Sequence, residues 1–316
     1  MQKAVTHWRR VCVVCGFLFL AACSSTTFVY NRLDFLLPWY VDDYVDLNQP
    51  QKQYLDELLQ PFLAWHRYRE LPDYLSILQG VESNLDHPQT PAMIAAVFSQ
   101  FEQAWLRLES ESLDWLLELG AQLSEEQITL LMEELWERQE EYEEEYLERT
   151  DAEFYEDSYE DAVDNAREYL GPLSDAQREV LRLFSRSLQR SDQAWLQARA
   201  RWLTQLAVLL ERKPGWQERV RKAVAMQREN PAPEYERIYN HNLAAIYNVI
   251  ADILNGRSEQ QDKHLRDRLQ ELQQDLQSLI AQGAESGPEG AQHTESGPDG
   301  AQHTGAGGVS TPVQAD

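Results

Sequence analysis

Cysteine is scarce: the 316 residues contain only Cys12, Cys15 and Cys23. The first two lie in an apolar stretch near the N-terminus that is typical of a secretory leader, so cleavage would leave one cysteine. A chain with one cysteine forms no internal disulfide, even in an oxidising compartment. We therefore expect stability to come from burial of apolar surface, for which about 260 residues are sufficient.

Basic side chains are also few, with 28 Lys and Arg against 53 Asp and Glu and a formal charge of −25. The leader holds three basic and no acidic residues, so its removal leaves 25 against 53 and a charge of −28. Such a chain is repelled by phosphates, which argues against nucleic acid as a partner. Adhesion to anionic lipid through a basic helix is excluded for the same reason.

Glycine is rare between the leader and residue 282, where it occurs only at Gly80, Gly120, Gly171, Gly215 and Gly256. Three of these stand two to four residues before a serine, as expected where a helix ends on glycine and the next begins on a serine cap. Alternating β-branched and polar residues are nearly absent. The sequence therefore predicts an all-α fold.

One pattern marks four predicted helix starts: Ser or Asn, two residues of any type, and then Gln. It begins at Asn48, Ser124, Ser174 and Ser258, each time with leucine four residues after the glutamine. This pattern is a capping box, in which the first side chain accepts from a free amide and the glutamine reaches back. Thr90-Pro91 is a fifth start, because proline suits the first helical position.

Together these signals predict an array or bundle of long antiparallel helices with short connections. A short amphipathic stretch is expected near 30–46, and helices near 49–69, 72–86, 91–119, 125–150, 152–170, 175–212, 216–229, 233–255 and 259–281. Pro61 and Pro72 should kink or break what would otherwise be one long helix over the first two of these ranges. Trp105 follows Phe98 and Phe101 at helical spacing, and tryptophans at such spacing are interpreted as core. The last helix has a narrow seam, Leu265, Leu269, Leu272, Leu276 and Leu279, suited to packing along one neighbour.

The N-terminus has Lys3, Arg9 and Arg10, an apolar run of about ten residues and then Leu20-Ala21-Ala22-Cys23. Spanning a bilayer needs roughly 20 residues, so the run is a signal peptide (1–22) and not an anchor. Its end resembles the bacterial lipobox. The resemblance implies that Cys23 receives a diacylglycerol and, after cleavage, an N-acyl chain. Ser24 implies sorting to the periplasmic face of the outer membrane. The alternative is a secreted protein with an incidental cysteine.

The composition changes at residue 283. ESGPEGAQHT at 285–294 repeats as ESGPDGAQHT at 295–304, and a glycine-rich end follows. Such a segment cannot bury apolar surface, so 283–316 is predicted to be a disordered tail after a single helical domain at 23–282. His293 and His303 recur ten residues apart. Repeat expansion explains them better than a metal site.

Several segments together resemble a family of proteobacterial lipoproteins of unknown function: Tyr30–Asp34, Trp39–Leu47, Ala64–Arg67 and Glu70–Pro72. The resemblance extends from the lipobox to the helix capped at Ser258. It implies a helical lipoprotein but no activity. Leu123–Gln127 and Leu173–Gln177 are also similar to the LTxxQ motif of Spy/CpxP-type periplasmic chaperones, although capping boxes explain these motifs without a shared function.

No pattern of catalytic or metal-binding residues is convincing. The acidic segment 140–164 could attract Ca²⁺ or Mg²⁺, but nothing in its spacing closes a ligand shell, and a solvated face with its tyrosines inward is favoured. Asp42 and Asp43 point about 100° apart on a helix. His66 has no nucleophile or metal partner placed by spacing. We predict no enzyme activity, cofactor or metal.

The sequence therefore favours a non-enzymatic lipoprotein that binds an unknown envelope protein or has a structural role. The candidate interaction surface comprises the residues near which the family resemblance concentrates: Trp39, Tyr40, Asp42, Asp43, Trp65, His66 and Arg67. The alternatives are a membrane-tethered periplasmic chaperone and an enzyme of unrecognised type.

Overall fold

The computed structural model describes residues 25–286, and this part of the chain is helical without any strand. Its elements are α2 (Ser25–Tyr30), α3 (Leu33–Asp42), α4 (Gln49–Trp65), the π-helix η1 (His66–Glu70), α5 (Leu71–Asn84), α6 (Pro91–Gln122), α7 (Glu125–Leu147), α8 (Asp151–Leu170), α9 (Asp175–Ser187), α10 (Asp192–Leu209), α11 (Trp216–Glu229), α12 (Pro233–Asn255) and α13 (Glu259–Ser286). The all-α prediction is confirmed. The predicted leader, Cys23 and residues 287–316 lie outside the described residues. Among 25–286, no helix has the length and apolar character needed to cross a bilayer.

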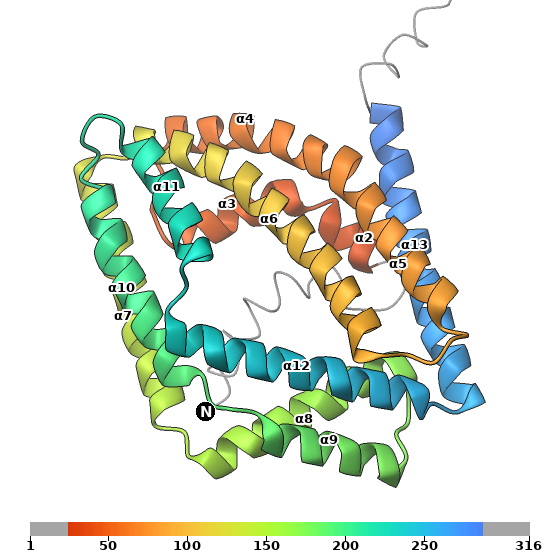
Figure 1. The fold of residues 1–316 in the computed structure, drawn as a ribbon. Helices are drawn as coiled ribbons and strands as arrows, with labels where there is room; N and C mark the ends of the chain where they lie inside the picture. The colour runs from red at the N-terminus through yellow and green to blue at the C-terminus, as the bar shows by residue number, and fades with distance from the viewer. Residues whose placement is uncertain (1–24, 287–316) are drawn as a thin grey trace, which may run out of the picture.

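The helices form a four-sided frame (Figure 1). Helices α4 and α6 form one side, α7 and α10 the next, α8, α9 and α12 the third, and α5 and α13 the fourth. Only some neighbours are consecutive in sequence: α8 packs on α9, whereas α5 packs on α13 and α7 on α10. The two short N-terminal helices attach to this frame, α2 on α13 and α3 on α4.

The predicted helix starts are confirmed. Asn48, Ser124 and Ser174 each close a capping box with the glutamine three residues on. Ser258 does so too, because its amide donates to Gln261 at 3.0 Å and its Oγ accepts from the Gln261 amide at 3.2 Å. The Thr90 side chain caps α6. The sequence analysis missed a further box, at Thr150 and Glu153, because Glu takes the place of Gln there.

The glutamines of these boxes also pair across two corners of the frame. Gln51 and Gln127 exchange amide hydrogen bonds of 2.9 and 2.8 Å, so the first turns of α4 and α7 meet. Gln177 and Gln261 do the same at 3.0 and 2.9 Å between α9 and α13. The Ser-x-x-Gln motif therefore has a structural task here, which is to join helix starts in pairs.

The prediction of one helix over 175–212 is wrong. Helix α9 ends at Ser187, and α10 begins at Asp192. The Gln189 amide donates to Asn242 Oδ1 at 2.9 Å, and Asn242 Nδ2 donates to the Gln189 carbonyl at 2.8 Å. The Asn242 side chain of α12 thus takes the place of the backbone groups that would bond to Gln189 in a continuous helix. It stabilises the break between α9 and α10.

Two other boundaries differ from expectation. Helix α4 continues through Pro61, and the irregular turn is η1, between Pro61 and Pro72. At the other end, α13 runs to Ser286 and enters the predicted tail. The Tyr68 hydroxyl donates to the Gly283 carbonyl, so η1 holds the end of α13.

Two hydrophobic clusters support opposite parts of the frame. One joins α5, α8, α9, α12 and α13, and the other joins α4, α6, α7, α10 and α11. Leu71 and Leu279 are fully buried in the first cluster, and Leu55 is fully buried in the second. All five leucines of the predicted α13 seam are buried in the first cluster. The frame therefore has no single central core.

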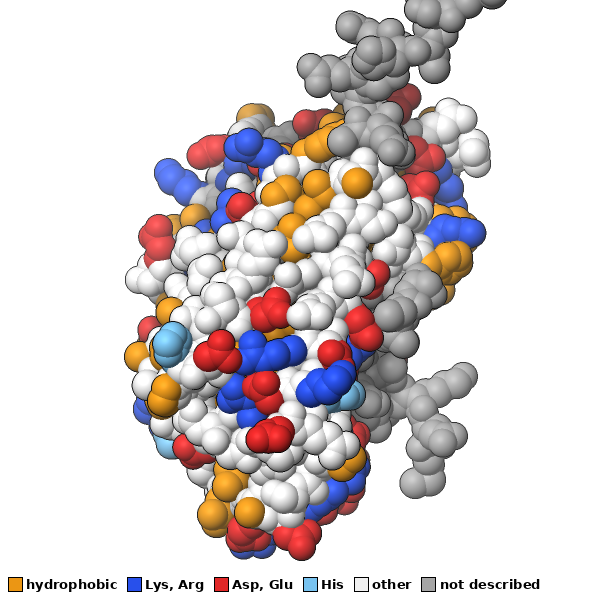
Figure 2. Space-filling view, turned by 90° about the vertical axis from the view of Figure 1, so that its right-hand side faces the viewer, with side chains coloured by type: hydrophobic (Ala, Val, Ile, Leu, Met, Phe, Trp, Pro, Cys, Tyr) orange, Lys and Arg blue, Asp and Glu red, His pale blue; other side chains and the backbone are white. Residues whose placement is uncertain are grey.

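Charged side chains of both signs alternate on the side formed by α5 and α13 (Figure 2). Arg266 there pairs with Asp86 at 2.6 Å and Asp262 at 2.8 Å. In the acidic segment, Glu140 and Glu144 are exposed while Tyr146 is buried, as the solvated-face interpretation predicts. The described residues contain no cluster of three side chains able to hold a metal ion.

Candidate interaction surfaces

The seven residues of the predicted surface do not lie together. Trp39, Tyr40, Asp42 and Asp43 are exposed at the end of α3. Asp42 accepts from Lys52 Nζ at 2.8 Å, which places this group beside the first turn of α4. Trp65, His66 and Arg67 follow the last turn of α4, and 13 residues of helix from Lys52 to Trp65 span about 20 Å. The residues of the predicted surface thus form two separate groups, one at each end of α4.

His66 is a core residue and cannot contact a partner, which corrects its assignment to that surface. It is 6% exposed, and its Nδ1 is 2.9 Å from the Tyr30 hydroxyl. The Tyr74 ring lies edge-on at 5.7 Å. Burial, assisted by the nearby Arg67 charge, lowers the pKa of His66 to about 4. A neutral imidazole therefore connects α2 to the π-helix.

Further contacts fix α2 to the body. The Arg67 guanidinium stands 5.1 Å above the Tyr30 ring and donates to Asn31 Oδ1 at 2.8 Å. Asn31 in turn donates to Gln282 of α13 at 2.9 Å. Burial raises the pKa of Tyr30 to about 12, so its hydroxyl stays protonated and available to His66. The first described helix is therefore rigidly attached, and the π-helix η1 provides the residues that hold it.

A buried ion pair next to this site was not predicted from the sequence. Glu70, in η1, is 1% exposed and accepts from Arg107 of α6 through both oxygens, at 2.7 and 2.8 Å. Arg107 also reaches the exposed Asp73 at 3.0 Å. The paired geometry satisfies the carboxylate and ties η1 to α6. No local sequence signal connects residues 37 positions apart.

Helix α3 is apolar on both sides although only one side is covered. Leu33, Leu37 and Val41 pack into the body. Phe35 and Trp39 are 67% and 60% exposed and lie roughly 180° around the helix from that row. On α2, Phe28 is 59% exposed, with the Arg32 guanidinium 4.9 Å from its ring. We call Phe28, Phe35 and Trp39 the N-terminal aromatic face.

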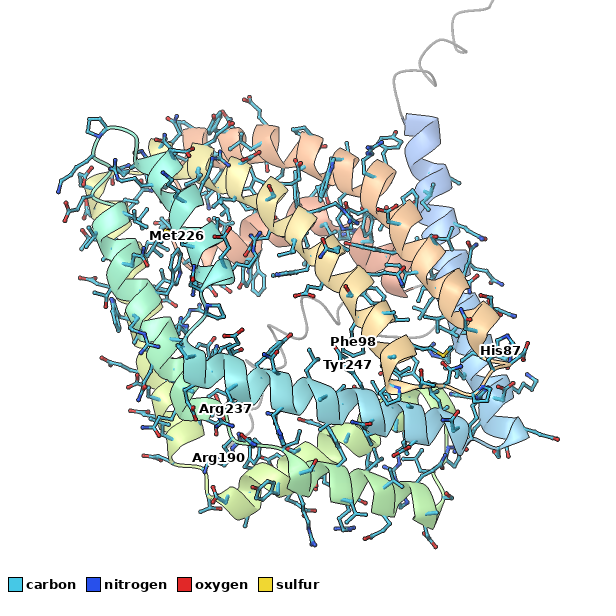
Figure 3. The ribbon with its side chains drawn as sticks, in the orientation of Figure 1. His87, Phe98, Arg190, Met226, Arg237 and Tyr247 are labelled. Carbon is cyan, nitrogen blue, oxygen red and sulfur yellow. The ribbon has the colours of Figure 1, made fainter. Side chains whose placement is uncertain are left out.

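A second exposed apolar group lies on α6 and α12, beside the end of α11, and Figure 3 labels Phe98 and Tyr247 in it. The rings of Phe98 and Tyr247 meet at 5.1 Å and join α6 to α12. Trp105 and Tyr239 are 40% and 49% exposed. We call these four residues the inner aromatic surface.

Helical spacing places Trp105 on the side of α6 that faces the other two helices. Phe98 and Glu109 lie seven residues before and four residues after Trp105, so the three share a helix face. Phe98 contacts α12, and Glu109 pairs with Arg228 of α11. The interpretation of Trp105 as core is therefore wrong. Its periodicity was correct, but no element among the described residues covers the ring completely.

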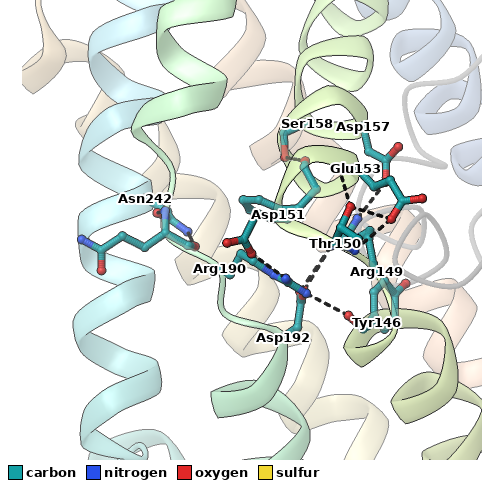
Figure 4. Close-up of polar contacts among 12 residues, drawn as sticks. Tyr146, Arg149, Thr150, Asp151, Glu153, Asp157, Ser158, Arg190, Asp192 and Asn242 are labelled. Atoms are coloured by element: carbon teal, nitrogen blue, oxygen red, sulfur yellow. Dashed lines mark hydrogen bonds and ion pairs between the residues drawn. The ribbon is translucent and has the colours of Figure 1, made fainter.

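The corner between α7, α8 and α10 is a polar cluster (Figure 4). Arg190 donates to Asp151 at 2.7 Å, to Asp192 at 3.0 Å and to the Tyr146 carbonyl at 3.0 Å. Arg149 adds an ion pair to Asp157 at 3.0 Å. The charged groups of this cluster therefore pair with one another, and the pairs link α7, α8 and the start of α10.

A model of a protein family of unknown function, DUF6279, matches residues 43–237. The match agrees with the resemblance to an uncharacterised family, although it covers less of the chain than the segments from the lipobox to Ser258. No curated protein and no solved structure matches the chain.

Proposed function

We propose that this chain, which belongs to the DUF6279 family of unknown function, is a non-enzymatic lipoprotein that binds a protein partner in the periplasm. In this proposal the lipidated Cys23 holds it on the periplasmic face of the outer membrane. Two acyl signals give durable anchoring where one chain does not, and the lipobox resemblance provides for more than one. The helical frame is then the part that meets the partner.

The inner aromatic surface supports partner binding. Large exposed apolar groups that gather from separate elements mark interaction sites more often than isolated ones do. Aromatic residues and methionine are also enriched in protein interfaces, where aromatic residues bury much area at small entropic cost. Trp105 and Tyr239 provide such area on α6 and α12, and the Glu109–Arg228 ion pair lies beside Trp105. The expected partner presents an apolar segment or helix face.

Photo-crosslinking in intact cells tests this surface. A photoreactive phenylalanine analogue at position 105 or 239 is expected to give the same discrete adduct. Matched controls carry the analogue at Leu183 or Val208, which are 60% and 61% exposed but lie elsewhere on the frame. Equal adducts from the controls, or none from positions 105 and 239, would contradict the proposal.

The same surface also favours a second candidate, a tethered periplasmic chaperone, because exposed apolar rings can contact varied apolar segments. A chaperone would give a smear of adducts from many proteins at positions 105 and 239. It would also suppress aggregation of an unfolded model client, and a Trp105→Ser, Tyr239→Ser variant would suppress it less. A single adduct without suppression of aggregation favours the dedicated partner.

The anchor is tested separately from the surface. A Cys23→Ser protein is expected to leave the membrane fraction, and the mass of the wild-type N-terminal peptide should show the acyl groups. Normal maturation and membrane fractionation of Cys23→Ser would place the anchor elsewhere.

A further inference from the structure

We infer that the N-terminal aromatic face (Phe28, Phe35 and Trp39) rests in the lipid headgroup region of the membrane that holds Cys23. The inference relies on the proposed lipidation of Cys23 and goes beyond it. The acyl chains hold the protein at the membrane, and the aromatic face fixes its orientation there.

The first argument is the exposure of this face. Helix α3 covers its inner side with Leu33, Leu37 and Val41, yet it presents Phe35 and Trp39 outward, each with more than half of its surface accessible. A helix that is apolar on both sides needs an apolar environment on both. Aromatic rings, tryptophan above all, favour the interface between lipid and water.

The second argument is the length of chain between the anchor and this face. Cys23 precedes the first residue of α2, Ser25, by two residues, which can span at most about 7 Å. Phe28 lies three residues further along a helix that rises about 1.5 Å per residue. Lipid attached to Cys23 would therefore keep α2 within a few residues' length of the headgroups.

The third argument is rigidity. Tyr30 is 5% exposed and bonds to the buried His66, while Asn31 bonds to Arg67 and Gln282. Helix α2 is thus attached to both η1 and α13, and it cannot swing freely as a tether. A rigid helix beside the anchor transmits the position of the membrane to the whole frame.

Charge argues for apolar insertion as the mode of contact. A mature chain with a net charge of −28 gains nothing from anionic headgroups. The local charges are mixed: Asp34 and Asp43 are exposed on α3 and its end, and Asp42 is paired with Lys52. Arg32 stands above the Phe28 ring, where a guanidinium suits a lipid phosphate. An acidic protein can therefore contact the membrane by inserting its aromatic rings, with the Arg32 guanidinium at the level of the lipid phosphates.

Site-directed fluorescence on the full lipidated protein tests the inference. Acylation blocks the sulfur of Cys23, so a single introduced cysteine is the only free thiol to carry a bimane label. We would place it at Phe35→Cys or Trp39→Cys and reconstitute the protein into vesicles of phosphatidylethanolamine and phosphatidylglycerol. Leu183→Cys on α9 is the matched control, because it is equally exposed.

Labels at positions 35 and 39 are expected to be quenched by nitroxide on the lipid chains and to be protected from aqueous iodide several-fold better than the label at 183. A second protein carries the label at Phe28→Cys with Phe35→Ser and Trp39→Ser. Its iodide accessibility should rise towards that of the control, while circular dichroism stays unchanged.

The outcomes separate this inference from the proposed anchor. Vesicle-bound, acylated protein with fully iodide-accessible labels at 35 and 39 would overturn the membrane contact and leave the anchor standing. Protection from iodide without quenching by lipid nitroxide would also overturn it, because something other than lipid covers the face. Protein that lacks acyl groups by mass and does not float with vesicles would overturn the proposed anchor itself.

Discussion

At the residue scale, His66 links proton binding to stability. Burial holds its folded-state pKa near 4, below the unfolded value of about 6.5, so the unfolded chain binds this proton more readily. Stability from His66 is therefore complete above pH 6.5 and falls as the pH drops towards 4. The wild type should lose about 2 kcal/mol through this group between pH 7 and pH 5.

A His66→Gln variant isolates that contribution, because glutamine keeps polar atoms for the Tyr30 hydroxyl but does not titrate. Urea unfolding at pH 7 and pH 5 should show a smaller pH-dependent loss in the variant than in the wild type. Carboxylates that titrate between pH 7 and pH 5 are present in both proteins, so their effect on the unfolding free energy cancels when the two proteins are compared. Parallel losses in the two proteins would mean that His66 is accessible to protons in the folded state.

The Glu70–Arg107 pair gives a second prediction. Arg107→Ala leaves a carboxylate that is 1% exposed without its cation, and we expect a loss of about 2–4 kcal/mol in unfolding free energy. Because the Arg107 guanidinium is half-exposed, this loss should be smaller than the largest losses measured for fully buried ion pairs. Adding Glu70→Gln to Arg107→Ala should restore part of the loss, because the uncompensated charge is gone.

Asp73 provides the control for this pair, since it contacts the same guanidinium at 3.0 Å from an exposed position. Asp73→Asn should cost less than about 1 kcal/mol, as exposed ion pairs do. Chemical denaturation measures all of these variants. A loss for Asp73→Asn as large as that for Arg107→Ala would show that the buried carboxylate is not the reason for the pair's importance.

At the element scale, the helix starts could be predicted from sequence because a capping box is local. Asn48, Ser124, Ser174 and Ser258 each act on residues three positions away. The break after Ser187 could not be predicted, because Asn242 holds it from 53 residues away. The pairing of α5 with α13 is likewise non-local.

The candidate surfaces follow the same division. Apolar spacing correctly indicated that Trp105 shares a helix face with another apolar residue, Phe98. Whether a face is covered depends on which helices meet, and the exposure of Phe35 and Trp105 follows from the frame. His66 was a surface candidate because the family resemblance concentrates near it. A π-turn that directs its ring towards Tyr30 made it a core residue.

The paired glutamines at the α9–α13 corner lead to a third prediction. Gln177 and Gln261 are 5% and 6% exposed, and Gln261 also donates to the Pro172 carbonyl at 2.8 Å. Gln261→Ala leaves buried polar groups without partners and should cost about 2–3 kcal/mol. Gln177→Ala should cost a similar amount, and the double variant less than the sum, because the two residues share their hydrogen bonds.

Glu153 offers a matched control, since it closes the exposed capping box at Thr150 without a partner across a corner. Glu153→Ala should cost about 1 kcal/mol, the ordinary value of a cap. Denaturation midpoints compare the three sites directly. Additive losses at Gln177 and Gln261, each no larger than at Glu153, would reduce the corner pairing to two independent caps.

At the scale of the whole molecule, closure of the frame depends on elements at both ends of the described chain. Helix α13 packs against α5 and α8 and supplies five leucines to one hydrophobic cluster. The family match stops at residue 237, before that helix begins. The matched segment holds all the fully buried residues of the second cluster, but it leaves the first without the residues that cover Leu71 and Leu170.

Truncation tests this division of the frame. A chain of residues 24–286 keeps both clusters and should unfold in urea with the same midpoint and steepness as the full mature protein. A chain of 43–237 should lose helicity in its α5 and α8 segments, because the apolar faces that α13 covers become exposed and about 25 cal/mol is lost per Å² of apolar surface. Circular dichroism and hydrogen exchange would detect that loss. Full protection of α5 in the shorter chain would show that the frame does not need α13 to close.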